Sequence, residues 1–155
     1  MPRISVGVIS DTHGVMRPEA LDALEGSDLI LHAGDVGAQH VLDALSELAP
    51  VHAVRGNVDK GPWANELPPA RTVTVGVARL HLLHRLADLA IGPAAKGIAA
   101  VVSGHSHVPR IETRDGVIYL NPGSAGPRRF RLPVAVARLI VDGARVEAEI
   151  VTLDV

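Results

Sequence analysis

Seven side chains of the kinds that bind metal ions stand just past successive apolar runs of this sequence. They comprise two carboxylates, one amide and four imidazoles, namely Asp11, His13, Asp35, Asn57, His84, His105 and His107. From one apolar run to the next, the leading ligands follow at intervals of 24, 22, 27 and 21 residues, close to the length of a strand, a connection and the return to the next strand. Such groups gather at the carboxyl edge of an open α/β sheet, so we expect all seven to converge on one crevice.

The short spacings and the flanking glycines favour the same convergence. Residues i and i+2 of an extended backbone face the same side, which predicts that Asp11 shares a pocket with His13, and His105 with His107. Glycine tolerates unusual backbone angles and lets neighbouring chain approach closely. It directly precedes three of the ligands, as Gly34, Gly56 and Gly104.

The size of the ligand set predicts two metal ions. Seven ligands are too many for one tetrahedral zinc site, but they suit two divalent ions that share a bridging carboxylate, for which Asp35 is the natural candidate. Oxygen and nitrogen ligands are compatible with Zn²⁺, Fe²⁺, Ni²⁺, Co²⁺ or Mg²⁺ as well as with Mn²⁺, which is the ion we expect. A lone Asp-x-His or His-x-His is more often a polar turn, so the hypothesis depends on the whole series.

The apolar pattern predicts the elements that must position these ligands. Short apolar runs typical of buried strands alternate with helical periodicity in the first third of the chain, which indicates βα units and a parallel sheet. The expected strands cover residues 4–9, 28–32 and 51–54, and the expected helices residues 18–25 and 39–48.

The remainder of the chain is predicted to be mainly strands. A hairpin-like pair, a weak helix and a further buried strand are expected at 71–75, 78–83, 88–96 and 98–102. Turn signals at Asp115-Gly116 and Asp142-Gly143 separate four later strands and predict an antiparallel C-terminal third. These strands cover 110–113, 117–120, 134–141 and 145–153. We expect one domain, residues 1–155, with two packed sheets and helices outside.

The ordered motifs resemble those of a known family. Asp11-x-His13, Gly34-Asp35, Gly56-Asn57-x-Asp59, His84 and Gly104-His105-x-His107 resemble the motif series of the calcineurin-like metallophosphoesterases. The short length and Asn121-Pro-Gly-Ser124 are similar to the compact bacterial and archaeal phosphodiesterase branch, over residues 4–124. The resemblance implies an α/β fold, a four-layer αββα sandwich of two mixed β-sheets flanked by helices.

The resemblance also implies a ligand set and a reaction. One ion would be held by Asp11, His13, Asp35 and His107, and the other by Asp35, Asn57, His84 and His105. The implied activity is a divalent-metal-dependent phosphodiesterase, a hydrolase of phosphoric ester bonds, in which a water activated by both ions attacks phosphorus in line. Asp35, Asn57 and His105 would be the catalytic residues beside that water.

Two positions depart from the family pattern. Val58 stands where a histidine often follows the asparagine and helps to protonate the leaving group, so we expect good leaving groups and diesters to be preferred over alkyl monoesters. Arg85 and Leu86 follow His84 where a glycine is usual. His81 is an alternative ligand, but residues i and i+3 of a strand face opposite sides, which favours His84 at the strand end.

Several other residues are candidates for substrate contacts or for structural roles. Arg55 and Trp63 are candidate substrate-binding residues, although the position of Trp63 favours a role as an anchor of the Gly61-Pro62 loop. Asp59 is predicted to stabilise its loop by side-chain hydrogen bonds. Three neighbouring arginines, Arg128, Arg129 and Arg131, form a cluster that either contacts the substrate phosphate or lies in a solvated loop. Three histidines, His32, His40 and His52, are expected to be structural or exposed.

Composition limits the alternatives. The absence of cysteine excludes thiolate metal sites and disulfides, and a net charge of −2 with 2% aromatic residues argues against dedicated nucleic-acid binding. We expect a cytoplasmic protein without membrane contact, a small phosphodiester or nucleotide-like substrate and, as an option, a homo-oligomer. Alternative functions are a phosphomonoesterase or nuclease on the same metals, or a non-catalytic scaffold like a retromer coat subunit. A scaffold would not need all seven ligands, which favours an enzyme.

Overall fold

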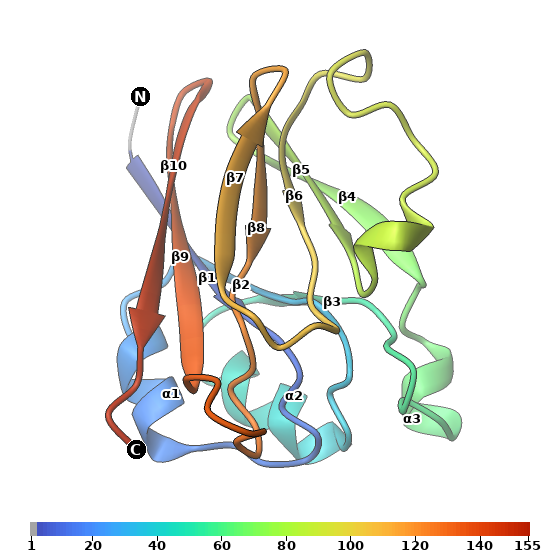
Figure 1. Ribbon diagram of the computed structural model, residues 1–155, viewed down its shortest axis with the longest axis vertical. Coiled ribbons are helices and arrows are strands. Elements are labelled where there is room, and N and C mark those ends of the chain that lie inside the picture. The colour runs from blue at the N-terminus through green and yellow to red at the C-terminus, as the bar shows by residue number, and fades with distance from the viewer. Residues whose placement is uncertain (1–2) are drawn as a thin grey trace.

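Two five-stranded mixed sheets pack face to face in the computed structural model, which describes residues 3–155 (Figure 1). The first sheet has the order β10-β9-β1-β2-β3. Its strands are β1 (Arg3–Ile9), β2 (Leu29–His32), β3 (Val51–Ala53), β9 (Ala135–Asp142) and β10 (Arg145–Thr152). The first three are parallel, as their βα pattern predicted, and β9 and β10 add an antiparallel edge.

The second sheet has the order β4-β5-β6-β8-β7. Its strands are β4 (Ala70–Val75), β5 (Ala78–Leu83), β6 (Ile98–Val102), β7 (Arg110–Arg114) and β8 (Val117–Asn121). Here the expectation of an antiparallel C-terminal third is wrong for β8, which pairs in parallel with β6. The connection after β6 carries the chain to the edge of the sheet, so the β7–β8 hairpin brings β8 back in the direction of β6.

Aliphatic side chains fill the space between the two sheets. Alternate residues of facing strands, such as Val6 and Val8 of β1 and Leu80 and Leu82 of β5, are fully buried there. Burying a side chain of this size contributes roughly 1.5–3 kcal/mol, so this layer supplies much of the stability. The scarcity of aromatic residues is therefore compensated by closely interdigitated Val, Leu, Ile and Ala.

Helices cover the outer face of the first sheet. These are α1 (Pro18–Leu24), α2 (Gln39–Ser46) and the short α3 (Pro62–Asn65), which the sequence did not predict. Leu24 of α1 and Leu45 of α2 pack on Ile9 and Ile30 of the sheet. Proline in the first turn of α1 and Gly26 at φ 86° beyond its end explain its bounds.

An irregular segment covers the outer face of the second sheet. The predicted helix at 88–96 is wrong: a single 3₁₀ turn, η1 (Leu86–Asp88), is followed by turns (Figure 1). Pro93 lacks a backbone N–H and disfavours helical angles at Gly92, which explains the break. Leu89 and Ile91 nevertheless pack on the sheet, so the fourth layer is present but not helical.

Within residues 3–155, no helix combines the length and apolar character needed to cross a bilayer.

Candidate metal centre

The expected ligands gather into two neighbouring groups. One group contains Asp11, His13 and His107, and the other contains Asp35, His84 and His105. Within each group, one ligand atom per residue lies within 4.8 Å of the others. The loops that follow β1, β2, β5 and β6 supply these residues. The predicted convergence is confirmed geometrically, but the ligands come from the edges of two sheets rather than of one.

Asp35 lies between the two groups. Its Oδ2 is 3.6 Å from Nε2 of His13 in one group and 3.2 Å from Nε2 of His84 in the other. Its Oδ1 accepts a 3.0 Å hydrogen bond from the N–H of Val58, which fixes the carboxylate. This is the placement expected of a carboxylate that bridges two ions.

Four buried polar atoms of the cluster have no hydrogen-bond partner among the described residues. They are Asp11 Oδ1, His13 Nε2, His84 Nε2 and His107 Nδ1. A buried polar atom without a partner costs about 1–3 kcal/mol, so such a concentration needs a compensating ligand. Carboxylate oxygens and imidazole nitrogens suit a divalent cation, and the residues therefore fit the implied metals.

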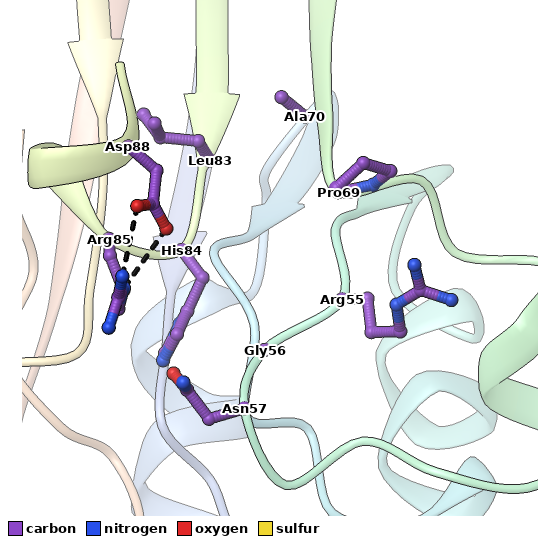
Figure 2. A pocket seen from close by; sticks show the side chains of 9 residues that line it. All are labelled: Arg55, Gly56, Asn57, Pro69, Ala70, Leu83, His84, Arg85 and Asp88. Carbon is purple, nitrogen blue, oxygen red and sulfur yellow. Dashed lines mark hydrogen bonds and ion pairs between the residues drawn. The ribbon is translucent and has the colours of Figure 1, made fainter. Parts of the chain in front are cut away.

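Asn57 also approaches the second group. Its exposed side chain lines a cavity together with His84, and its amide points toward the tip of the His84 ring (Figure 2). The Nδ1 of His84 lies 2.8 Å from the carbonyl of Ala33, which orients the ring and leaves Nε2 directed into the cluster. An imidazole held in this way through its other nitrogen is typical of metal sites.

His81 is separated from the cluster. Its Nδ1 is 2.9 Å from Oγ1 of Thr72 on the neighbouring strand β4. The structure therefore supports the choice of His84 rather than His81.

The backbone of the ligand loops is left-handed rather than extended. Five of the ligands have positive φ angles, which range from 48° to 72°: Asp11, His13, Asp35, His105 and His107. This conformation costs non-glycine residues roughly 1–2 kcal/mol each, and such strain concentrates at functional sites. The expectation that an extended backbone turns ligands i and i+2 to the same side is therefore wrong, because the backbone at these residues is not extended.

The consequence is clearest for the C-terminal histidine pair. His107 joins Asp11 and His13, whereas His105 joins Asp35 and His84. The two histidines therefore serve different groups within one cluster instead of facing one pocket together. The partition agrees with the ligand assignment that the family resemblance implies.

Glycines allow the loops to pack against the ligands. A Cβ on Gly56 would lie 2.1 Å from the backbone nitrogen of Asp35, and one on Gly104 would lie 2.5 Å from Oδ2 of Asp11. Side chains at these positions would displace both carboxylates. The close approach predicted for the glycines is thus required at this site.

Neighbouring polar groups hold the two carboxylates in place. Oδ2 of Asp11 accepts hydrogen bonds from Oγ of Ser10 at 2.6 Å and from the N–H of His105 at 3.0 Å. The role of Ser10 was missed, although it directly precedes a ligand. Asp59 accepts from the backbone N–H groups of Val36, Gly37 and Gly56, which confirms its predicted loop-stabilising role.

Electrostatics favour the charge states that metal binding needs at Asp35 and His107, whereas at His84 burial lowers the pKa but is outweighed by the hydrogen bonds to Asp35 and to the carbonyl of Ala33, which raise it. Burial raises the pKa of the Asp35 carboxyl, but the imidazole of His84 and the N–H of Val58 outweigh it and hold that pKa well below its usual range. Burial lowers the pKa of His107, and the positive charge of Arg129 adds to this effect against the opposing charge of Asp11. The cluster therefore offers an ionised carboxylate and a neutral imidazole.

The two candidate substrate-binding residues lie in different parts of the structure. Arg55 lines the cavity beside Asn57 and His84, on the wall opposite Arg85 (Figure 2). Trp63 instead packs on the helix-covered face of the first sheet and lines a separate cavity with Leu42 and Leu67, so the structure does not bring it to the cluster. Its placement corresponds to the structural alternative.

The arginine cluster lies in an exposed turn. Arg128 donates a hydrogen bond to the carbonyl of Val155 at 3.2 Å, and Phe130 between the arginines is 95% exposed. Arg129 is close enough to influence the pKa of His107.

His32 connects the loop of Asp11 to the loop of Asp35 through hydrogen bonds. It is fully buried, its Nδ1 accepts from the N–H of Gly34 at 3.1 Å, and its Nε2 lies 3.0 Å from Oγ1 of Thr12. The Thr12 hydroxyl donates its own hydrogen to the carbonyl of Val36 at 2.8 Å, so its oxygen accepts a hydrogen bond from the Nε2–H of His32. The imidazole is therefore neutral and ties the loop of Asp11 to that of Asp35.

This arrangement predicts a pH-dependent stability. Burial lowers the pKa of His32 to about 4, below the value of about 6.5 expected for the unfolded chain. Between these values the unfolded state binds the extra proton, so stability falls with falling pH, by about 2 kcal/mol between roughly pH 6.5 and pH 5. Urea unfolding of the metal-free protein should show this loss, and His32→Gln should reduce it. An equal loss in the variant would contradict the assignment.

Comparison with known proteins agrees with the geometry. Residues 4–144 match the model of the calcineurin-like phosphoesterase superfamily domain. A probable metallophosphoesterase of Methanothermobacter thermautotrophicus is 37% identical over 161 aligned positions, which cover 94% of this chain and 91% of that protein.

Solved structures share the fold at lower identity. A protein described as a novel archaeal phosphodiesterase superposes with a TM-score of 0.78 at 20% identity, covering 96% of this chain and all of that one. Wild-type Vps29 of Entamoeba histolytica, complexed with Zn²⁺, has a TM-score of 0.75 at 22% identity, covering 97% and 100%. With the site and the sequence match together, this chain belongs to the calcineurin-like phosphoesterase superfamily, a family of metal-dependent hydrolases of phosphoric esters.

Proposed function

We propose that the protein is a phosphodiesterase that uses two divalent metal ions, with Mn²⁺ as the first ion to test. The observation that carries this proposal is the position of Asp35 between two groups of ligand atoms, 3.6 Å from His13 and 3.2 Å from His84. When bound, two such ions would supply an activated water and stabilise the charge of the phosphoryl oxygens. The archaeal neighbour described as a phosphodiesterase adds support.

The exposed residues of the cluster indicate where substrate enters. Asn57 and His105 are solvent-exposed, whereas Asp11, Asp35 and His107 are buried. Asn57 and His105 are therefore placed to contact a phosphoryl group, while the buried residues hold the centre. His105 can donate a hydrogen bond to a phosphoryl oxygen through its ring, and the Asn57 amide can do the same.

The surroundings favour esters with good leaving groups. Val58, beside Asn57, is 48% exposed and carries no proton to donate. An alkoxide leaving group needs a proton donor, whereas a nitrophenolate leaves as a stable anion. We therefore expect activated diesters to be hydrolysed faster than alkyl monoesters.

The test compares bis(p-nitrophenyl) phosphate with p-nitrophenyl phosphate and an alkyl monoester. Protein stripped with chelator should be inactive, and Mn²⁺ should restore cleavage of the diester above that of either monoester. In ¹⁸O-labelled water, the heavy oxygen should appear in the phosphate product, because the water attacks phosphorus and the bond between phosphorus and the leaving-group oxygen breaks. Faster turnover of the alkyl monoester would instead identify a phosphomonoesterase. Folded protein that stays inactive with Mn²⁺, Zn²⁺, Ni²⁺ and Mg²⁺ would favour the scaffold.

A further inference from the structure

Two cavities open on either side of Arg85. The first, of about 460 Å³, is lined by Arg55, Asn57 and His84, and the second, of about 520 Å³, by Leu86, His105 and Val108. Arg85 lines both. Each volume falls within the range of small-molecule sites, roughly 300–1,000 Å³.

Both cavities meet at the second ligand group. His84 forms part of the wall of the first cavity and His105 part of the wall of the second, and their ring centroids are 5.3 Å apart. A phosphoryl group bound beside these rings would therefore have one cavity on each side. A phosphodiester carries two organic substituents, and this arrangement offers separate space to each.

Arg85 is held as the partition between the cavities. Its Nε and one terminal nitrogen donate to the two carboxylate oxygens of Asp88 at 3.0 and 2.9 Å (Figure 2). This two-point contact fixes the guanidinium plane better than a single hydrogen bond would.

The two cavities differ in chemistry. The first contains the charged groups of Arg55, Arg85 and Asp88. In the second, Leu86 and Val108 are 37% and 44% exposed, so their aliphatic surfaces face the cavity space rather than the core.

Asn121 and Arg110, two polar residues that line the second cavity, already have partners. The Asn121 amide donates to the carbonyl of Gly104 and to Oγ of Ser106, both at 3.0 Å, and Arg110 pairs with Glu112 at 2.7 Å. Paired groups gain little from a polar ligand, whereas covering exposed aliphatic surface is favourable. The lining therefore favours an apolar occupant.

We propose that the cavity lined by Leu86 and Val108 binds an apolar, ring-sized ester substituent of a phosphodiester, while the cavity between Arg55 and Arg85 receives the other, more polar substituent. This inference rests on the proposed diesterase function. It assigns the substrate class as diesters with two bulky arms, of which one is apolar.

The direct test follows methyl resonances of Zn²⁺-loaded protein by NMR, with diphenyl phosphate and dimethyl phosphate as probes of equal charge. Diphenyl phosphate should shift the methyl signals of Leu86 and Val108, and dimethyl phosphate should leave them in place. The signals are assigned by their loss in single serine variants. Unshifted Leu86 and Val108 signals at saturating diphenyl phosphate would overturn the inference.

A kinetic test uses the double variant Leu86→Ser/Val108→Ser. The ratio of kcat/KM for bis(p-nitrophenyl) phosphate to that for methyl p-nitrophenyl phosphate should fall roughly tenfold, because only the diaryl ester has a second ring. Val77→Ser, an equally conservative change at a 60% exposed position in the β4–β5 turn, should leave the ratio unchanged. An unchanged ratio in the double variant would contradict the subsite.

The two tests separate this inference from the proposed function. Cleavage of methyl p-nitrophenyl phosphate with an unchanged ratio and unshifted methyl signals would leave the diesterase intact and overturn the subsite. Absence of all diester cleavage would overturn the proposed function, and a shift of the methyl signals would then still show an apolar binding cavity.

Discussion

Replacement of Asp35 by asparagine should abolish metal-dependent diester hydrolysis, with a loss of at least about 10³-fold in kcat/KM. Asp35 Oδ2 lies between the two ligand groups, so the change removes the one negative charge that both ions would share. Asparagine has nearly the same shape, and its carbonyl can still accept from the N–H of Val58. The chain should therefore fold while its metal centre fails.

The measurement combines turnover with metal content. Inductively coupled plasma mass spectrometry should find two metal ions per chain in the parent protein after loading and fewer in Asp35→Asn. Asp22→Asn on α1 removes an exposed carboxylate of the same charge and should change neither quantity. A variant that retained two ions and full turnover would refute the bridging role of Asp35.

Replacement of Gly56 by alanine should have the second-largest effect on metal binding and stability, because the added Cβ would displace the backbone and the carboxylate of Asp35. The added Cβ would lie 2.1 Å from the nitrogen of Asp35 and 2.3 Å from its Oδ1. Backbone atoms cannot rotate aside, so the β2 and β3 loops must separate. Overpacking of this kind costs typically 1–3 kcal/mol, and we expect about 3 kcal/mol of the unfolding free energy together with loss of tight metal binding.

Gly92→Ala provides the matched control. The nearest atom to a Cβ at Gly92 is the Ala95 Cβ at 4.0 Å, an ordinary contact, and its φ is not in the left-handed region. Urea unfolding in chelator and metal titration by calorimetry should show little change in this variant. Similar losses in Gly56→Ala and Gly92→Ala would mean that glycine's chain entropy, rather than close approach to Asp35, explains the effect.

Most strands were predictable because their burial pattern is local. The buried runs ending at Ile9, His32 and Val102 appear as strands in the structure, with bounds within one or two residues of those expected. The helix expected at 88–96 failed for an equally local reason, since Pro93 interrupts the hydrogen-bond pattern that the apolar residues suggested. Leu89 and Ile91 were correctly identified as apolar cover, but not as helix.

The pairing of strands that are distant in the sequence was harder to predict. Nothing local distinguishes a strand that pairs in parallel with β6 from one that pairs antiparallel, so the position of β8 depended on where the chain after β6 could cross the sheet. The same limit applies to Trp63, whose sequence position beside the Asn57 motif suggested a substrate contact. Its ring is directed to the helix layer by α3, an element of four residues that gave little periodic signal.

The sequence alone determined that the ligands converge. Ligands at the ends of parallel strands meet at one edge of their sheet, so their order and spacing predicted a common site, and the face-to-face packing of the two sheets brings the two edges together. Only the tertiary structure decided how the ligands divide into two groups. Left-handed backbone conformations orient the side chains of Asp11, His13, Asp35, His105 and His107. The packing of loops from both sheets places His105 and His107 in different groups. Such turns are strained in isolation and persist only when surrounding contacts, such as those of Gly56 and Gly104, impose them.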